Sequence, residues 1–180
     1  MAVVDTDIKL RLSVKTGSAG DSTASSVAAS LGKYMSTTAI TDATKANLLA
    51  NITQAESTAG VVKYKCLFVL NDHASQTAEG MRVHISAQDA GGGVVAIGLD
   101  PAGATARNSG SAQAAEIADE ETAPTGVTFS APSTYDDGIV VGDVAFDECA
   151  AVWVRLTVDA NIAAMDEDQA LLEFTWATDA

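Results

Sequence analysis

Several residue types that carry chemistry are scarce in this chain of 180 residues. It has two cysteines, two histidines and three prolines, and aromatic residues make up 5% of it. His73 and His84 are not spaced as metal ligands, and His84 falls on the polar face of its predicted strand, so we expect it at the surface. So few aromatics leave little to stack on sugars. Cations are scarce as well: 10 Lys and Arg stand against 24 Asp and Glu, a formal net charge of −14. Such a surface repels phosphate backbones and anionic lipids, so we expect neither nucleic acid nor a membrane as a partner.

Long hydrophobic runs are also absent from the sequence. None approaches the ~20 consecutive apolar residues that a membrane-spanning helix needs. The first ten residues, MAVVDTDIKL, have neither the basic start nor the apolar run of a secretion signal. Without such a signal, Cys66 and Cys149 are expected to be free thiols, with a disulfide between them as the alternative.

Motifs for catalysis or cofactor binding are missing too. No serine stands in a G-x-S-x-G turn, Gly32-Lys33 lacks the rest of a phosphate loop, and the run Gly91–Gly93 does not open a helix. The acidic turns 136–137, 143–148 and 166–168 could bind calcium, but none follows the pattern of a calcium loop. We therefore predict solvated acidic turns, no metal, no cofactor and no enzymatic activity.

Hydrophobic residues make up 47% of the chain, which is enough for one core. The ratio of its two acidic residue types is unusual. Asp outnumbers Glu by 16 to 8, and there are only 6 Lys. An Asp-rich, Lys-poor surface suits high salt, where hydrated carboxylates stay soluble and their repulsion is screened. The alternative is an acidic protein from an ordinary host.

Alternation of apolar and polar residues with a period of two predicts about eight short strands among nine candidate segments. They are expected at residues 7–15, 33–40, 61–70, 82–88, 95–99, 127–129, 138–141, 149–158 and 170–177. The second half of 61–70 is apolar on both faces, as in a central strand. Segment 95–99 is expected to return beside 82–88 as a hairpin.

One helix is expected, over residues 41–53, with Thr41 or Asp42 as its cap. The Gly/Ser-rich stretch 16–32 predicts a long loop that is either mobile or laid on the surface. Together these features indicate an all-β fold, an Ig-like or Greek-key β-sandwich with an irregular N-terminal extension. We expect residues 1–57 to form that extension and 58–180 to form the sandwich.

Two groups of residues are candidates for contact with a partner. Trp153 and Arg155 share the face of their strand that points away from its apolar row, and an aromatic beside an arginine is typical of an interface anchor. The alternative is that a second layer covers Trp153. Lys9, Arg11 and Lys15 make the first strand locally basic in an acidic chain, so that edge is the other candidate.

The same alternation bears on the cysteines. Cys66 shares the face of Tyr64 and Phe68, which is expected to point at the core. Cys149 shares the face of Trp153, which is expected to point outward. Opposite faces argue against a disulfide.

Two stretches resemble the strand patterns of Ig-like modules: YKCLFVLNDHASQTAEGMRVHIS and GIVVGDVAFDECAAVWVRLTVDA. The whole chain resembles an uncharacterised family of tailed-phage proteins. The elements that carry this resemblance are DIKLRLSVKTGSAGDSTASSVAASLGKYMSTTAI, the strand from Gly60 to Asn71, IGLDPAGATA, TAPTGVTFSAP and ECAAVWVRL. The resemblance implies a virion component and supplies no functional residues.

The expected function follows from that resemblance. It is a structural virion protein, best placed as a decoration or cement protein on the capsid, that binds the major capsid protein or other virion proteins as a homo-oligomer. It would be assembled in the host cytoplasm, and the acidic composition fits a haloarchaeal tailed virus. The alternatives are a neck, tail or baseplate component, or an Ig-like module that binds a host receptor or glycan.

Overall fold

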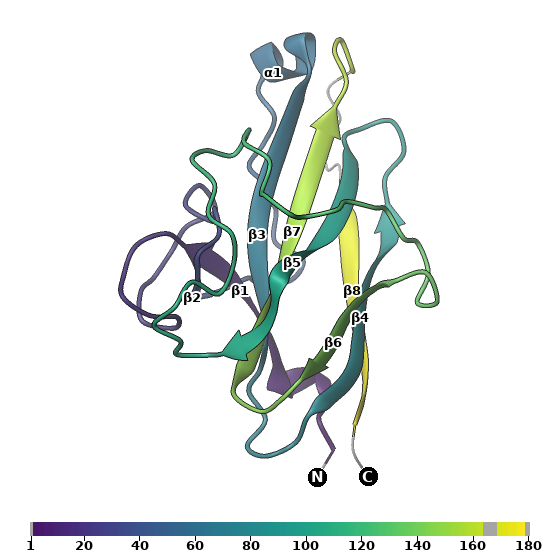
Figure 1. The fold of residues 1–180 in the computed structure, drawn as a ribbon. Helices are drawn as coiled ribbons and strands as arrows, with labels where there is room; N and C mark the ends of the chain where they lie inside the picture. The colour runs from purple at the N-terminus through teal and green to yellow at the C-terminus, as the bar shows by residue number, and fades with distance from the viewer. Residues whose placement is uncertain (1, 164–168, 179–180) are drawn as a thin grey trace.

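Two antiparallel β-sheets lie face to face in the computed structural model, which describes residues 2–163 and 169–178 (Figure 1). The elements in these residues are η1 (Asp5–Asp7), β1 (Ile8–Val14), β2 (Tyr34–Ala39), α1 (Gln54–Ala59), β3 (Val61–Asn71), β4 (Ala78–Gln88), β5 (Val94–Ala106), β6 (Ile139–Val144), β7 (Glu148–Val158) and β8 (Ala170–Thr178). One sheet has the order β2-β1-β3-β7-β5 and the other the order β6-β4-β8. The predicted all-β sandwich is therefore confirmed.

The centre of the five-stranded sheet is the pair β3 and β7. Their register is unbroken from Val61 opposite Val158 to Leu70 opposite Cys149. Both strands bury side chains on both of their faces, because other segments of the protein cover both faces of this sheet. Apolar residues on both faces are what the sequence of 61–70 showed, and its central position is as predicted.

β1 and β2 come from the stretch expected to form an N-terminal extension. β1 pairs with β3 from Ile8 opposite Asn71 to Leu12 opposite Leu67, and β2 pairs with the other edge of β1. Both are integral strands of the five-stranded sheet. The boundary expected near residue 57 thus falls inside one sandwich.

The main core lies between the two sheets. Val69 and Val152 of the large sheet meet Met81 and Val83 of the small one, and all four are fully buried. Burying an apolar side chain of this size contributes about 2 kcal/mol. This cluster is the principal source of stability between the sheets.

A second cluster lies on the opposite face of the five-stranded sheet, beneath loops instead of strands. Phe68, Cys149 and Trp153 are buried there. The covering segments, 16–33 and 107–130, are tied to each other: the Lys33 amide donates to the Ala115 carbonyl at 3.1 Å. The Gly/Ser-rich stretch is therefore laid on the protein surface, one of its two predicted alternatives.

The helix predicted over residues 41–53 is wrong. Ala43 and Ala46 have φ angles of 52° and 54°, which a right-handed helix excludes, and helix α1 begins only at Gln54. Its start is fixed by a capping box: Thr53 Oγ1 accepts from the Glu56 amide at 3.3 Å, and Glu56 Oε2 accepts from the Thr53 amide at 2.7 Å. The Thr-x-x-Glu signature of this cap is present in the sequence.

Two strand predictions also need correction. β5 does not return beside β4; it crosses to the other sheet and pairs with β7, for example Val95 opposite Leu156. Alternation gives the same pattern for a strand beside β4 and for one packed across the core from it. Residues 127–129 form no strand, and only Ser130 makes an isolated bridge to Ile97, while the stretch packs on the outer cluster.

Cys66 and Cys149 are free and buried, as expected of their thiols. The expectation that they lie on opposite faces is wrong, because both belong to the outer cluster with Trp153. The face of β3 that carries Cys66 points at the covering loops, not at the core between the sheets. The strand register sets the two cysteines apart along the pair, with Cys149 opposite Leu70 and Cys66 opposite Trp153.

Candidate functional site

A hollow of about 2500 Å³ lies on the inner face of the five-stranded sheet, beside β8. Leu67 of β3 and Val154 and Leu156 of β7 are among the apolar residues that line it. The small sheet packs over the side of the large sheet that carries β5 and β7. In the part of the chain that the structure describes, the hollow is thus a place where the three-stranded sheet has no fourth strand.

A further wall of the hollow is formed by residues 42–54. Leu48 of this segment is buried, and Leu49 and Ile52 pack against the core between the sheets. The segment contains no strand, and the φ angles of Ala43 and Ala46 are far from extended. It fills part of the inner face without pairing with β8.

β8 is unusually exposed for a strand of a sandwich. Leu172, Phe174 and Trp176 point toward the core between the sheets, yet each is only half-buried. By contrast, Met81 and Val83 on the neighbouring β4 are completely buried. The missing neighbour of β8 therefore leaves a row of large apolar side chains partly in water.

The free edge of β8 faces the hollow. All residues from Gln169 to Ala177 line it, including both those that point toward the core and those that point away from it, which is what a strand with its edge toward the space would show. In the described part of the chain β8 ends the small sheet, with β4 as its one strand partner. An unpaired strand edge presents a row of amide and carbonyl groups to any extended chain that approaches.

Charged residues of both signs line the hollow. They are Asp5, Asp42, Asp89 and Glu173, together with Lys9, Arg11 and Lys45. Arg11 is held at 2.8 Å by Asp21, which does not line the hollow. The chain as a whole has a formal charge of −14, which repels acidic partners.

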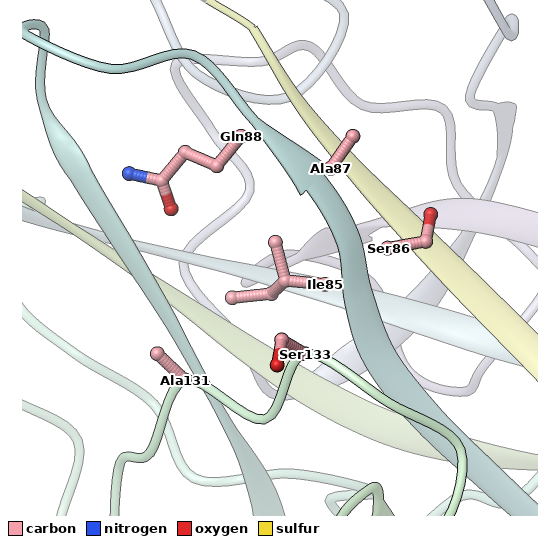
Figure 2. Close-up of a pocket in the computed structure, with 6 residues that line it drawn as sticks. All are labelled: Ile85, Ser86, Ala87, Gln88, Ala131 and Ser133. Atoms are coloured by element: carbon pink, nitrogen blue, oxygen red, sulfur yellow. The ribbon is translucent and has the colours of Figure 1, made fainter.

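A second, shallow hollow of about 230 Å³ lies beside the end of β4, and Figure 2 shows the side chains around it. Gln88 closes the turn after β4, donating to the Gly93 carbonyl at 2.9 Å and accepting from the Val95 amide at 3.2 Å. The Ile85 amide donates to the Pro132 carbonyl at 2.8 Å. These polar groups therefore hold the chain's own turns together.

A cluster of charged residues, two of them buried lysines, lies near the start of β3. Lys63 contacts Glu56 and Glu120, and Lys65 contacts Glu120 at 2.8 Å. The hydrogen bond from Lys63 is the main cause that lowers the pKa of Glu56 to about 2. Burial raises the pKa of Glu120, but its hydrogen bonds with the two lysines outweigh this and lower it. The cluster joins α1, β3 and the outer loop. Its role is therefore structural.

Trp153, expected to point outward, is fully buried by the chain itself. Its Nε1 donates to the Asp100 Oδ2 at 2.9 Å, and Gly32 of the covering segment lies against its ring. The expectation that Trp153 is an exposed anchor is therefore wrong. The alternative, that a second layer covers it, is confirmed. Arg155 is half-buried, with its guanidinium carbon 5.2 Å from the centre of the Phe129 ring.

The basic residues of the first strand are likewise engaged within the chain. The Lys9 ammonium donates to the Thr6 carbonyl, and Arg11 pairs with Asp21. The Lys15 ammonium donates to the Ile117 carbonyl at 2.8 Å. Two of these residues, Lys9 and Arg11, line the hollow beside β8, whereas Lys15 holds the outer loop.

The acidic turns use several of their carboxylates internally. Asp143 accepts from the Gly80 amide at 2.8 Å, Glu148 accepts from the Ala145 amide at 3.2 Å, and Asp147 pairs with Arg107. Across residues 2–163 and 169–178, no three His, Cys, Asp or Glu side chains are grouped as metal ligands. The turn 166–168 lies outside the described residues.

His84 differs from its expected position. It was predicted on a polar, exposed face, but its side chain is buried beside Glu173 of β8, with Nε2 3.7 Å from a carboxylate oxygen. Its other ring nitrogen, Nδ1, is buried without a hydrogen-bond partner. One histidine and one half-exposed glutamate do not make a metal site.

Comparison of the chain with protein-family models, curated proteins and solved structures gives no match. No helix in the described part of the chain is long and apolar enough to span a membrane. Sequence reasoning missed the hollow beside β8. The alternation of Leu172, Phe174 and Trp176 predicted the strand, but a missing neighbour leaves no pattern in the sequence.

Proposed function

We propose that the protein is a structural component of a tailed-virus particle, an accessory head protein of the decoration or cement type, and not an enzyme. One observation carries the protein-binding part of this proposal. The hollow beside β8 offers half-buried apolar side chains and a free strand edge, which another polypeptide can cover. The assignment to a virus particle is supported by the resemblance of the chain to tailed-phage structural proteins.

The buried polar groups also suit a structural role. Asp100 accepts hydrogen bonds from Trp153 and from the Ala115 amide, and Gln113 bonds the Met35 amide at 2.9 Å. The contacts of Ala115 and Gln113 join a covering loop to the five-stranded sheet, and the bond between Trp153 and Asp100 links two strands of that sheet. Polar chemistry is used here to hold long irregular segments in place on a rigid sandwich.

Function as a decoration protein would follow from repetition. A capsid presents the same docking site many times, and an oligomer that engages several sites gains avidity without new kinds of contact. The acidic outer surface keeps the protein soluble, and it fits a particle that is exposed to a salty medium. The proposed partners are the major capsid protein or another virion protein, together with further copies of this chain.

The copy number of the chain in purified particles tests this proposal. Quantitative mass spectrometry against the major capsid protein should find the chain at a copy number comparable to that of capsomers. Its density should then lie on the outer shell in a particle reconstruction. Absence from purified particles refutes the proposal, and a few copies per particle would place the chain in the neck, tail or baseplate instead.

A further inference from the structure

We infer that the hollow beside β8 binds an extended segment of a partner protein, which pairs with the edge of β8, is apolar at alternate positions and carries basic residues, not acidic ones. The inference rests on the proposed function only in expecting a protein partner. It adds the chemistry by which that partner is recognised.

The backbone of β8 favours an extended occupant. β8 has 9 residues and is hydrogen-bonded to β4 on one side, while its other edge faces the hollow. A small molecule cannot satisfy a row of amide and carbonyl groups that spans about 30 Å at ~3.3 Å per residue. A strand added along this edge can, and main-chain hydrogen bonds then supply affinity for any chain of the right shape.

The apolar walls require side chains at alternate positions. In a strand beside β8, every second residue points to the same side as Leu172, Phe174 and Trp176, into the hollow. Those residues would pack between the half-buried row of β8 and the half-buried Ile8 and Leu10 of β1, which also line the hollow. The residues between them would stay on the solvent side, where no apolar partner is needed.

The charge of the chain sets the sign of the segment. Asp5, Asp42, Asp89 and Glu173 line the hollow together with Lys9, Arg11 and Lys45, and Arg11 is paired with Asp21. The chain as a whole repels acidic segments because its formal charge is −14. Lysine or arginine in the segment meets complementary charge, which favours encounter.

Residues 2–163 and 169–178, which the structure describes, do not supply this segment. β1 has the required pattern, with Ile8, Leu10 and Leu12 alternating with Lys9 and Arg11, but it is already paired with β2 and β3. Residues 42–54 line the hollow in a conformation that is not extended.

A second copy is also disfavoured as the occupant. If its β8 paired with the first, its five-stranded sheet would need the space in which β1 and residues 42–54 of the first copy stand. Each copy would also bring a formal charge of −14 to the contact.

A synthetic peptide tests the inference. The probe is KVTVTVTVK with both ends blocked, and the two controls are KVVTTTVVK, which has the same composition without alternation, and EVTVTVTVE, which reverses the end charges. Isothermal titration calorimetry on the full chain should show saturable binding of the probe at least tenfold tighter than of either control. Hydrogen exchange should slow at the amides of β8 and leave those of β2, the edge strand of the other sheet, unchanged.

Two variants locate the site. Glu173→Lys changes an exposed side chain beside the hollow and should weaken the probe at least threefold, whereas Glu121→Lys makes the same change on the outer loop and should not. Phe174→Thr should abolish binding, and circular dichroism shows whether that variant remains folded. If Phe174→Thr is unfolded, Glu173→Lys and the exchange pattern of β8 still decide the result.

Several results would overturn the inference. These are no saturable binding at millimolar peptide, equal binding of the three peptides, protection away from β8, or dimers of the free chain that bury β8. The proposed function is tested separately by copy number in particles. A chain that is abundant in particles but does not bind the probe leaves the function standing and removes this site, and the reverse result removes the virion role alone.

Discussion

Trp153 and Asp100 meet beneath the outer loops, where the indole Nε1 donates a hydrogen bond of 2.9 Å to the Asp100 Oδ2. Both side chains are buried, Trp153 at 0% exposure and Asp100 at 1%. The same carboxylate also accepts from the amides of Ala102 at 3.0 Å and Ala115 at 2.8 Å. One buried aspartate thus fixes segment 107–130 on the five-stranded sheet.

Asp100→Ala should therefore loosen that segment. It removes the acceptors of all three donors and leaves the buried Trp153 Nε1 and the Ala115 amide unpaired, at a cost of about 2 kcal/mol or more. Urea unfolding measures this loss, and hydrogen exchange should speed up at the Ala115 amide. The matched control is Asp136→Ala in an exposed turn, which should change the stability little. Equal losses in the two variants would contradict the role given to Asp100.

Gly32 marks the closest approach of the two covering segments. Its φ is +90°, and a Cβ there would lie 1.8 Å from the Ala115 carbonyl oxygen and 2.9 Å from the Trp153 ring. Gly32→Ala should lower the free energy of unfolding by about 3 kcal/mol or more, from backbone strain and overpacking together. At Gly110 the nearest atom is 3.8 Å away, so Gly110→Ala should cost less than about 0.5 kcal/mol. Similar thermal shifts for both variants would argue against tight packing at Gly32.

The sequence predicted the positions of the strands far better than it predicted which strands pair. The central position of β3 followed from apolar residues on both its faces, and β7 was marked by the alternation of Val152, Val154 and Leu156. A period of two cannot say which strand pairs with which, because a strand across the core has the same pattern as one alongside. That is why β5 was expected beside β4 and lies beside β7 instead.

The outer layer and the hollow could not be predicted for a related reason. The stretches that bury Trp153 are polar, Ala-rich and irregular, so no periodicity announces that they pack on a sheet. The hollow beside β8 exists because no described strand pairs with the second edge of β8, and a sequence carries no signal for an absent strand. The start of α1 is different, since Thr53 and Glu56 carry a capping signature that a closer reading of the sequence would have found.

The buried charge cluster predicts how stability depends on acid. The pKa of Glu56 is lowered from 4.5 to about 2, mainly by the hydrogen bond from Lys63. The pKa of Lys63 is raised, since its hydrogen bonds with Glu56 and Glu120 outweigh the opposing effect of burial. In acid, therefore, only the carboxylates titrate. A lowered carboxyl pKa contributes stability that is complete above the unfolded pKa and is lost as the pH falls through the folded one.

Glu56→Gln should consequently destabilise the protein at neutral pH, and the difference from the unmodified chain should shrink as the pH falls from 4.5 toward 2. Urea unfolding at a series of pH values measures that difference. Glu121→Gln removes the same charge from an exposed side chain and is the matched control. A difference between Glu56→Gln and the unmodified chain that stays constant over this pH range would mean that the ion pair with Lys63 contributes nothing.

The two buried cysteines test whether the covering segments keep reagents in solution away from the five-stranded sheet. Burial raises the pKa of Cys149 to about 12 and that of Cys66 well above its usual range. Because the thiolate is the reactive form, iodoacetamide at pH 8 should leave both thiols unmodified in the folded chain and label both in urea. A cysteine introduced by Ser18→Cys on the exposed part of the covering segment should react at once and serves as the control. Prompt labelling of Cys66 in the folded chain would show that segments 16–33 and 107–130 open over the sheet, and Gly32→Ala should then increase that rate further.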